Sequence, residues 1–470
     1  MTVTAGTTGR NGAGGHRSAE RIGHTETGPR QLPPLGAQRT VPELELADRT
    51  LPNGLRVVAV ARRTVPTVEL RLRIPFADSA PSAGSTFPAR AEMVASALLT
   101  GAAGRTRVEI DDALATIGGE LAAGVDPERL LISGSGLAEG LPALLGVLAD
   151  LLTSATYPDG DFDRERERLV ERIAVARSQP RTVAREALQR RRYGDHPAAR
   201  EMPLAEDVAA VTSEQVRELH RAAVLPTGST LVLVGDVDPE GAIGTVADVL
   251  AGWAPPGPAT ELPPLPLLTG RDLLLVDRPG AVQSQLRLSA AAVPRTDPRY
   301  PAVQLANLVL GGFFSSRLVE NIREDKGYTY SASSYLEFAP SGATLLVETD
   351  VATDVTAPAL LETRYELARL SAVPPTEAEV ESARRYAIGS LLISLDSQPG
   401  LASTLAALSG VGLDARWLRG HPARLEAVTP EQVARAAAEF FTPTAFTGVV
   451  VGDASAVGPG LRALGGVELP

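Results

Sequence analysis

The same sequence pattern occurs twice in this chain. The segment T-S-E-Q-V-R-E-L-H starts at Thr212 and leads to T-L-V-L-V-G-D, which ends at Asp236. The segment T-P-E-Q-V-A-R-A-A starts at Thr429 and leads to T-G-V-V-V-G-D, which ends at Asp453. The start and the end of the second copy each lie 217 residues after those of the first (429 − 212 and 453 − 236). A unit of helix followed by strand therefore recurs without a gap. This repeat restricts the chain to folds that contain two similar domains.

A second correspondence lies upstream of these closing segments. The triplet L-R-L occurs at Leu70–Leu72 and again at Leu286–Leu288, an offset of 216 (286 − 70). A chain of 470 residues is long enough for two such units. The proline-rich stretch between the copies predicts a semi-rigid linker. The predicted parts are a flexible tail at 1–40, an N-terminal domain at 41–253, the linker at 254–268 and a C-terminal domain at 269–470.

The spacing of apolar residues predicts helices and strands in a consistent order. Asn53-Gly54 signals a tight turn between apolar runs, and Val68–Ile74 alternates strictly, so a half-buried antiparallel strand pair is expected here. The spacing of apolar residues further along the chain predicts a strand at 129–134 and helices at 89–99, 108–117, 137–152 and 162–178. We therefore expect an α+β fold of two homologous α/β domains, whose antiparallel-dominated sheets carry helices on one face.

Composition excludes several classes of function. The chain has no cysteine, which removes disulfides, thiolate metal sites and cysteine nucleophiles, and only five histidines. A net charge of −11, with Lys326 as the single lysine, disfavours nucleic-acid binding, which needs clustered cations. The N-terminus lacks the apolar core of a signal peptide, and the most apolar helical stretch, Leu141–Leu152, is too short to span a bilayer. We expect a cytoplasmic protein that binds neither nucleic acid nor membrane.

Several motifs together resemble the insulinase-like zinc peptidases of family M16, and in particular their processing-peptidase branch (M16B). The resemblance covers almost the whole chain after residue 45, including L-P-N-G-L-R-V, Y-G-D-H-P at Tyr193–Pro197 and both V-G-D closings. Its most specific part is G-G-F-F-S-S-R-L-V-E-N-I-R-E-D-K-G-Y-T-Y-S at Gly311–Ser331. The resemblance implies two M16-type metallohydrolase domains, and a chamber that encloses a peptide when two such halves or chains pair.

The zinc signature of that family is missing here. The family carries H-x-x-E-H on a helix of the first half, where two His bind zinc and the Glu is the general base, and a further Glu ligand about 75 residues later. The corresponding segment, Arg90–Gly101, contains no histidine. With one residue of ambiguity in register, the three positions fall on Glu92, Ala95 and Ser96, or on Met93, Ser96 and Ala97. We therefore expect that this chain binds no metal and no other cofactor.

No other residue is expected to rebuild the metal site. Glu171 stands near the position of the distal ligand, but without partners we interpret it as a charged residue on an amphipathic helix. His196 and His220 are 24 residues apart, and neither has a second histidine at helical spacing. His196 and His421 each precede a proline, and we interpret both as residues that shape a turn or a surface contact.

The second half keeps residues that the family uses to hold its substrate. The resemblance implies that Arg323, at the end of a helix, and Tyr330, in the following strand, contact the substrate backbone near the scissile bond. A guanidinium and a phenol can both donate hydrogen bonds to a peptide carbonyl and to the oxyanion that develops from it. The alternative is that Arg323 pairs with Glu320 or Glu324, and that Tyr330 is an ordinary strand aromatic.

The local sequence around this pair predicts the helix that carries it. Ser315 or Ser316 is suited to cap the helix, and Gly327 is well placed to end it. Gly311 and Gly312 would permit close approach of a peptide backbone and are expected to bind substrate; a plain turn is the alternative.

These features favour a non-catalytic subunit of a heterodimeric M16B-type zinc peptidase. The chain would form half of a peptide-enclosing chamber and supply Arg323 and Tyr330, while an M16 homologue with an intact H-x-x-E-H would supply Zn²⁺. Alone, the chain is not expected to be active. The alternative is a catalytically inert structural or peptide-binding protein of the same fold, and a third hypothesis is hydrolysis through an unconventional site. Peptide turnover and removal of a leader segment are both compatible with the sequence.

Overall fold

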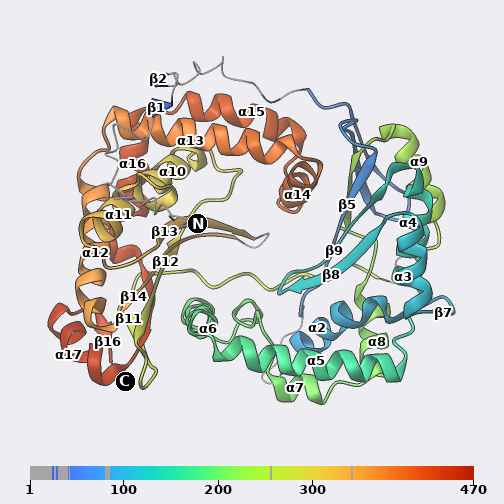
Figure 1. Cartoon of the computed structure of the whole chain (residues 1–470), viewed down its shortest axis with the longest axis horizontal. Helices are drawn as coiled ribbons and strands as arrows, with labels where there is room; N and C mark the ends of the chain where they lie inside the picture. The colour runs from blue at the N-terminus through green and yellow to red at the C-terminus, as the bar shows by residue number, and fades with distance from the viewer. Residues whose placement is uncertain are drawn as a thin grey trace, which may run out of the picture. The chain divides into compact units, whose positions relative to one another are not determined.

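The computed structural model of the chain describes residues 41, 43–79, 85–254, 257–339 and 342–469 in full (Figure 1). Before them, it describes only the backbone of two short antiparallel strands, β1 (His24–Thr25) and β2 (Gly28–Pro29). Residues 1–40 form a unit separate from Val41–Pro470. The predicted flexible tail therefore lies almost wholly outside the described residues.

The first half of the chain builds a six-stranded sheet in the order β3-β4-β10-β5-β9-β8. All neighbours in this sheet are antiparallel except β4 and β10, which run parallel. The strands are β3 (Leu46–Thr50), β4 (Arg56–Ala61), β5 (Thr67–Pro75), β8 (Glu120–Asp126), β9 (Arg129–Leu137) and β10 (Thr230–Gly235).

The second half builds another six-stranded sheet in the order β13-β14-β12-β15-β11-β16. Here β11 is parallel to both of its neighbours, and the other pairs are antiparallel. The strands are β11 (Leu273–Asp277), β12 (Gln283–Ala291), β13 (Ala332–Ala339), β14 (Gly342–Ala352), β15 (Thr447–Gly452) and β16 (Val467–Glu468).

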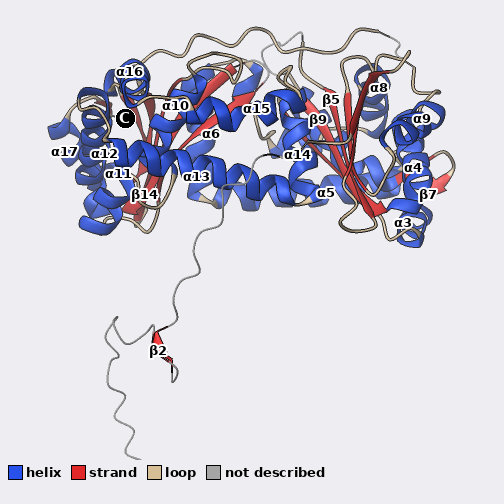
Figure 2. Cartoon of the chain, turned by 90° about the horizontal axis from the view of Figure 1, so that it is seen from above, coloured by secondary structure: helices blue, strands red, loops and turns tan. Residues whose placement is uncertain are grey.

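The two sheets share one topology, and this confirms the structural meaning of the sequence repeat. The V-G-D strands β10 and β15 hold the same central place, beside β5 and β12, which carry the repeated L-R-L. One edge differs. In the first sheet β3, from the start of the chain, lies antiparallel to β4, whereas in the second β16, from its end, lies parallel to β11. Figure 2 shows the strands in two groups with helices along each.

The predicted pairing of the first strands is only partly right. The turn at Asn53-Gly54 does connect an antiparallel pair, β3 and β4, and Gly54 has a φ of +89°. However, the alternating strand β5 does not pair with β4. Strand β10, from the end of the first half, lies between them. A strand that arrives more than 150 residues later is invisible to a local pattern, and its six fully buried residues give no hint of register.

The helices of the first half follow the predicted order and pack mainly on one face of its sheet. Their apolar sides join β4, β5 and β9 in one core. The α-helices are α2 (Phe87–Ala97), α3 (Arg107–Thr116), α4 (Leu141–Ser154), α5 (Asp159–Ser178), α6 (Pro180–Tyr193), α7 (Ala205–Ala209), α8 (Ser213–Ala223) and α9 (Pro239–Val249). The shorter elements are η1 (Leu98–Thr100), β6 (Gly101–Ala102), β7 (Arg105–Thr106), η2 (Ala138–Gly140) and η3 (Pro197–Ala199).

The helices of the second half form a matching core. The α-helices are α10 (Tyr300–Asn307), α11 (Arg317–Val319), α12 (Thr356–Ala372), α13 (Glu377–Asp396), α14 (Gln398–Ser409), α15 (Ala415–Glu426), α16 (Pro430–Phe440) and α17 (Ala454–Leu464). The remaining elements are two π-helical turns, η4 (Leu308–Gly312) and η5 (Glu320–Asp325), and the short turns η6 (Thr353–Val355) and η7 (Pro443–Ala445).

The repeated closing helices begin in the same way. In α8 the side chain of Thr212 accepts a hydrogen bond from the backbone N–H of Gln215, whose side chain accepts one from the N–H of Thr212. In α16, Thr429 and Gln432 form the same capping box. The T-x-E-Q motif therefore recurs because the same local interaction starts both helices.

One helical run is long and apolar enough to span a membrane by length and composition. Among the described residues it is Tyr300–Asp325, a different run from Leu141–Leu152. Within it, 72% of the most apolar window is buried inside the protein. That degree of burial is typical of a core helix.

Each half contributes one helix to the other half's sheet. Leucines of α14 form an apolar cluster with Val58 and Val60 of β4 and with Val232 and Val234 of β10. On the other side, α6 packs its apolar residues against β15 and β14 of the second sheet. Both helices begin within a Ser-Gln-Pro sequence, at 178–180 for α6 and at 397–399 for α14. The exchange covers the face of each sheet that its own helices leave open.

Polar contacts reinforce this exchange. The side chain of Gln398 accepts a hydrogen bond from Thr67 Oγ1 at 2.7 Å and donates one to the carbonyl of Arg62 at 2.6 Å. From α6, Arg191 pairs with Glu468 of β16. Because α6 and α14 each belong to one half by sequence and to the other by packing, the two halves are expected to unfold together.

Candidate functional site

The structure resolves the register of the segment that corresponds to the zinc motif. On α2, Met93 and Ala97 are fully buried in the core, whereas Glu92 and Ser96 are half-buried on another face. Residues four apart on a helix share a face. A pair of ligands would have to stand at 92 and 96, with Ala95 at the position of the base. This face therefore holds one carboxylate, one hydroxyl and no imidazole.

The residue that meets this face from α5 is Arg172. Its Nη2 donates a hydrogen bond to Ser96 Oγ at 3.2 Å. The neighbouring Glu171 is exposed, as expected of a charged residue on an amphipathic helix. A step of one residue turns a helix by about 100°, so the two side chains of this pair point in different directions. The residue that stands opposite α2 is thus a cation, and sequence reasoning missed it by one position.

Glu92 lies in an environment that disfavours its charge. Burial raises the pKa of Glu92 to about 6, and the nearby guanidinium of Arg172 opposes that shift. No group of three His, Asp or Glu side chains that could hold a metal occurs in the described parts of the chain. The charges that this face of α2 presents are the Glu92 carboxyl and, from α5, the guanidinium of Arg172.

The raised pKa predicts a gain in stability on removal of the Glu92 charge. A carboxyl group whose folded pKa exceeds its unfolded value opposes folding when it is ionised, so the penalty is present above about pH 6 and absent below about pH 4.5. Glu92→Gln should therefore raise the free energy of unfolding by up to about 2 kcal/mol at pH 7.5. Denaturant titrations at pH 7.5 and pH 4 measure the difference. The matched control is the exposed Glu171→Gln, and an equal gain in both variants would refute the assignment.

His220 is a structural residue. Its Nε2 lies 3.0 Å from the carbonyl of Leu152, which can only accept, so Nε2 carries the hydrogen. Its Nδ1 therefore accepts from the hydroxyl of Tyr157 at 2.7 Å. Both side chains are buried, and burial lowers the pKa of His220. The pair holds α8 against the segment after α4.

Loss of the Tyr157 hydroxyl should be costly. Tyr157→Phe leaves Nδ1 of His220 buried without a donor, which typically costs about 1–3 kcal/mol. Chemical denaturation at pH 7.5 should show a lower midpoint and an unchanged slope. Tyr365→Phe, at a tyrosine that is 53% exposed on α12, is the control. A midpoint as high as that of the control would show that the hydrogen bond contributes nothing.

The two histidines before prolines have different environments. His196 shapes a turn as predicted, since its Nδ1 accepts from the N–H of Ala198 at 3.1 Å. His421 was predicted to lie at a turn or surface, and this is wrong. It is buried inside α15 and stacked 4.6 Å from the ring of Trp417. Burial lowers the pKa of His421 to about 4, and because Pro422 continues the helix, proline was a misleading signal here.

In the second half, Arg323 and Tyr330 lie side by side. The guanidinium carbon of Arg323 is 4.9 Å from the ring centre of Tyr330 and 4.9 Å from that of Phe314. Tyr330 is 85% exposed and Phe314 is 61% exposed. The guanidinium also pairs with Glu324, 3.2 Å from Nε, as the alternative interpretation predicted. The structure therefore brings the predicted pair together and adds Phe314, which the sequence did not single out.

The backbone that carries this pair differs in detail from the prediction. Arg323 lies in the π-helical turn η5, and Gly327, with a φ of +65°, follows its end as expected. Ser316 occupies the position before α11, but its side chain makes no capping hydrogen bond. Tyr330 precedes β13, which begins at Ala332, so its placement in the strand was wrong. The tyrosine is on an exposed bend, where no neighbouring strand fixes its side chain.

Gly311 and Gly312 end the turn η4, where the helix closely approaches its neighbours. A Cβ at Gly311 would lie 2.9 Å from the backbone nitrogen of Ser334 in β13, and one at Gly312 would lie 2.7 Å from Leu308 Cδ2. The close approach is thus to the protein's own strand and helix. This gives both glycines a packing reason, and their contact with a substrate remains a prediction.

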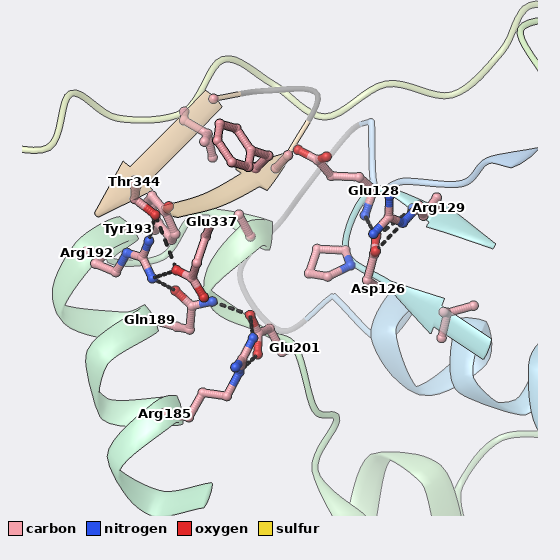
Figure 3. Close-up of a pocket in the computed structure, with 17 residues that line it drawn as sticks. Asp126, Glu128, Arg129, Arg185, Gln189, Arg192, Tyr193, Glu201, Glu337 and Thr344 are labelled. Carbon is pink, nitrogen blue, oxygen red and sulfur yellow. Dashed lines mark hydrogen bonds and ion pairs between the residues drawn. The ribbon is translucent and has the colours of Figure 1, made fainter. Parts of the chain in front are cut away.

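A cavity of about 360 Å³ lies where α6 meets the hairpin of β13 and β14 (Figure 3). Arg192, whose side chain is 3% exposed, pairs there with Glu337 at 2.8 Å and donates to Thr344. Arg185 and Gln189 both donate to Glu201. No sequence motif indicates this cluster, because its members come from both halves of the chain.

Comparisons with known proteins agree with these observations. The family model described as "Insulinase (Peptidase family M16)" matches residues 91–205, and the one described as "Peptidase M16 inactive domain" matches residues 210–386. An uncharacterized zinc protease of Mycobacterium tuberculosis is 28% identical over 378 residues, 77% of this chain and 84% of that protein. One of Streptomyces coelicolor is 28% identical over 309 residues, 62% of this chain and 65% of that protein.

Solved structures show the same fold. A structure described as a peptidase M16 inactive domain from Pseudomonas fluorescens superposes with a TM-score of 0.78 at 24% identity, over 87% of this chain and 98% of that one. A protease from Helicobacter pylori gives a TM-score of 0.79 at 18% identity, over 87% and 99%. At these identities the likeness concerns the architecture of the two halves and not their activity.

Proposed function

The chain belongs to the insulinase-like peptidase family M16, and from that premise we propose that it is the non-catalytic subunit of a heterodimeric zinc peptidase. The observation that carries the proposal is the difference between the two halves. The first half has Glu92, Ser96 and Arg172 where a zinc site would need three ligands. The second half presents Arg323 and Tyr330 together on an exposed surface.

The chemistry of this pair suits peptide hydrolysis. Attack on a peptide carbonyl places negative charge on its oxygen, and hydrogen-bond donors held near that oxygen stabilise the charge. Arg323 has a guanidinium and Tyr330 has a phenol hydroxyl, and both groups can donate hydrogen bonds. Phe314 and Tyr330 flank the guanidinium, which limits the positions it can take. The chain would thus orient the scissile carbonyl and stabilise its developing charge.

The remaining chemistry would come from the partner. We propose a second M16 chain with an intact H-x-x-E-H, whose Zn²⁺ would supply the activated water and whose Glu would be the general base. The two chains would enclose a short or unfolded peptide in the cytoplasm. Removal of a leader segment and general turnover of peptides remain two versions of this proposal.

One observation favours the alternative, a structural or peptide-binding protein without a catalytic role. Arg323 is already paired with Glu324 and stacked between two aromatic rings, so it needs no ligand to satisfy it. In that case the chain would bind its partner or a peptide, and the activity of the complex would not depend on Arg323.

Reconstitution tests the proposal. This chain, a homologue with H-x-x-E-H from the same genome, and their mixture are assayed on a library of fluorogenic peptides. We expect activity only in the mixture, with a one-to-one complex in size-exclusion chromatography. Full activity of the homologue alone would refute the proposal, and so would activity of this chain alone.

A further inference from the structure

The polar face of α2 carries an interaction that the proposed function does not use. Glu92 and Ser96 stand one turn apart on this face, and the residues beside them, Met93 and Ala97, are fully buried. The face is met by α5, and the contact between the two helices is made there by Arg172, whose Nη2 lies 3.2 Å from Ser96 Oγ. Arg172 therefore contacts Ser96 directly, and its charge also acts on Glu92, one turn earlier on the same face.

These three side chains do not fit the zinc ion that the family implies. Zinc in proteins takes imidazole, thiolate and carboxylate ligands, with three from the protein in a catalytic site and four in a structural one. Here only Glu92 is such a ligand. The hydroxyl of Ser96 is a weak donor to a metal, and the guanidinium of Arg172 has no lone pair to give and carries a permanent positive charge.

The charge of Arg172 also bears on whether a metal ion could bind here. Its charge is directed at the same groups that a bound cation would contact, since it donates to Ser96 and acts electrostatically on the carboxylate of Glu92. A divalent ion in contact with residues 92 and 96 would lie within a few ångströms of this guanidinium. Like charges at that separation repel each other.

We propose that Arg172 is a cation that takes the place of a metal ion beside Glu92 and Ser96 on this face of α2 and excludes divalent metals. On this proposal, the side chains at 92, 96 and 172 are the reason that no zinc site forms. The packing of α2 against α5 would still allow one. This inference rests on the family and on the geometry of the first half, and it does not depend on a partner chain or on Arg323.

The test is to replace the side chains and measure zinc. Glu92→His with Ser96→His and Arg172→Glu restores three ligands on the same backbone. We expect this triple variant to bind one Zn²⁺ per chain in isothermal titration calorimetry and in elemental analysis after dialysis. Glu92→His with Ser96→His and Arg172→Gln removes the cation without adding a third ligand, and it should bind zinc more tightly than Glu92→His with Ser96→His, which keeps Arg172. Equal affinity in these last two variants would overturn the proposal, and so would a folded triple variant with Arg172→Glu that binds no zinc.

A second measurement does not depend on the redesigned site. In the wild-type background, the titration of Glu92 is followed through the pH dependence of unfolding. Arg172→Gln removes the cation and should shift this titration to higher pH, whereas Arg172→Lys should leave it close to that of the wild type. The control is Arg168→Gln, one turn away on α5, where Arg168 pairs with Glu165 at 2.8 Å. If Arg172→Gln titrates like the control, Arg172 does not act on Glu92 and the proposal is wrong.

Discussion

Arg323→Ala should lower kcat/KM of the reconstituted complex by about 100-fold or more, because it removes a charged donor from the developing oxyanion. Tyr330→Phe removes a single neutral donor and keeps the ring over Arg323, so a smaller loss of about 10-fold is expected. Both losses should appear mainly in kcat, since the donors are needed most in the transition state. Steady-state assays on the best fluorogenic peptide measure both constants.

Matched controls separate this role from folding and assembly. Arg385→Ala and Tyr365→Phe change exposed residues of the same types on α13 and α12 and should leave kcat/KM unchanged. Each variant should still co-elute with the partner in size-exclusion chromatography. If Arg323→Ala and Tyr330→Phe retain full activity in an intact complex, the inert alternative replaces the proposal.

Leu405→Ala should destabilise the whole chain by about 3 kcal/mol, although Leu405 belongs by sequence to the second half alone. Its side chain is 2% exposed and lies in the apolar cluster between α14 and the strands β4 and β10 of the first half. The truncation leaves a cavity between elements of both halves. Since α6 makes the reciprocal contact, neither half is expected to stay folded when this packing fails.

The two tryptophans allow a direct measurement. Trp253 lies in the core of the first half. Trp417 packs against the core of the second half and against the cluster that contains Leu405, so single-tryptophan variants follow the first half and the second half with its contact surface. Denaturant unfolding should give the same midpoint for both reporters, and Leu405→Ala should lower both equally. The control Leu361→Ala changes a leucine that is 51% exposed on α12 and should have little effect. A shift seen only through Trp417 would show that the halves are independent.

Much of the fold could be predicted because it depends on local interactions. The helices α2, α3 and α5 occur within a few residues of their expected bounds, since apolar periodicity and a start signal decide where each forms. The capping boxes at Thr212 and Thr429 begin equivalent helices for the same reason. The repeat fixed the most important prediction, two sheets with a common topology.

The candidate site was predictable only in part. The absence of histidine from α2 follows from the sequence, and so does the spacing of Arg323 and Tyr330. The direction in which a side chain points does not follow from the sequence. Glu171 and Arg172 are neighbours in the chain, yet only Arg172 reaches Ser96. Likewise Phe314, just after η4, contacts Arg323 in η5 only in the folded chain. No motif indicates that contact.

The sequence by itself thus determined the family, the two repeated units and the absence of histidine from α2, because each of these depends on residue types and spacings. Only the tertiary structure decided what lies next to what. It placed β10 between β4 and β5, exchanged α6 and α14 between the halves, and set Arg172 against α2. These contacts join residues tens to hundreds of positions apart, and burial of apolar surface and pairing of charge select them only once the chain is packed.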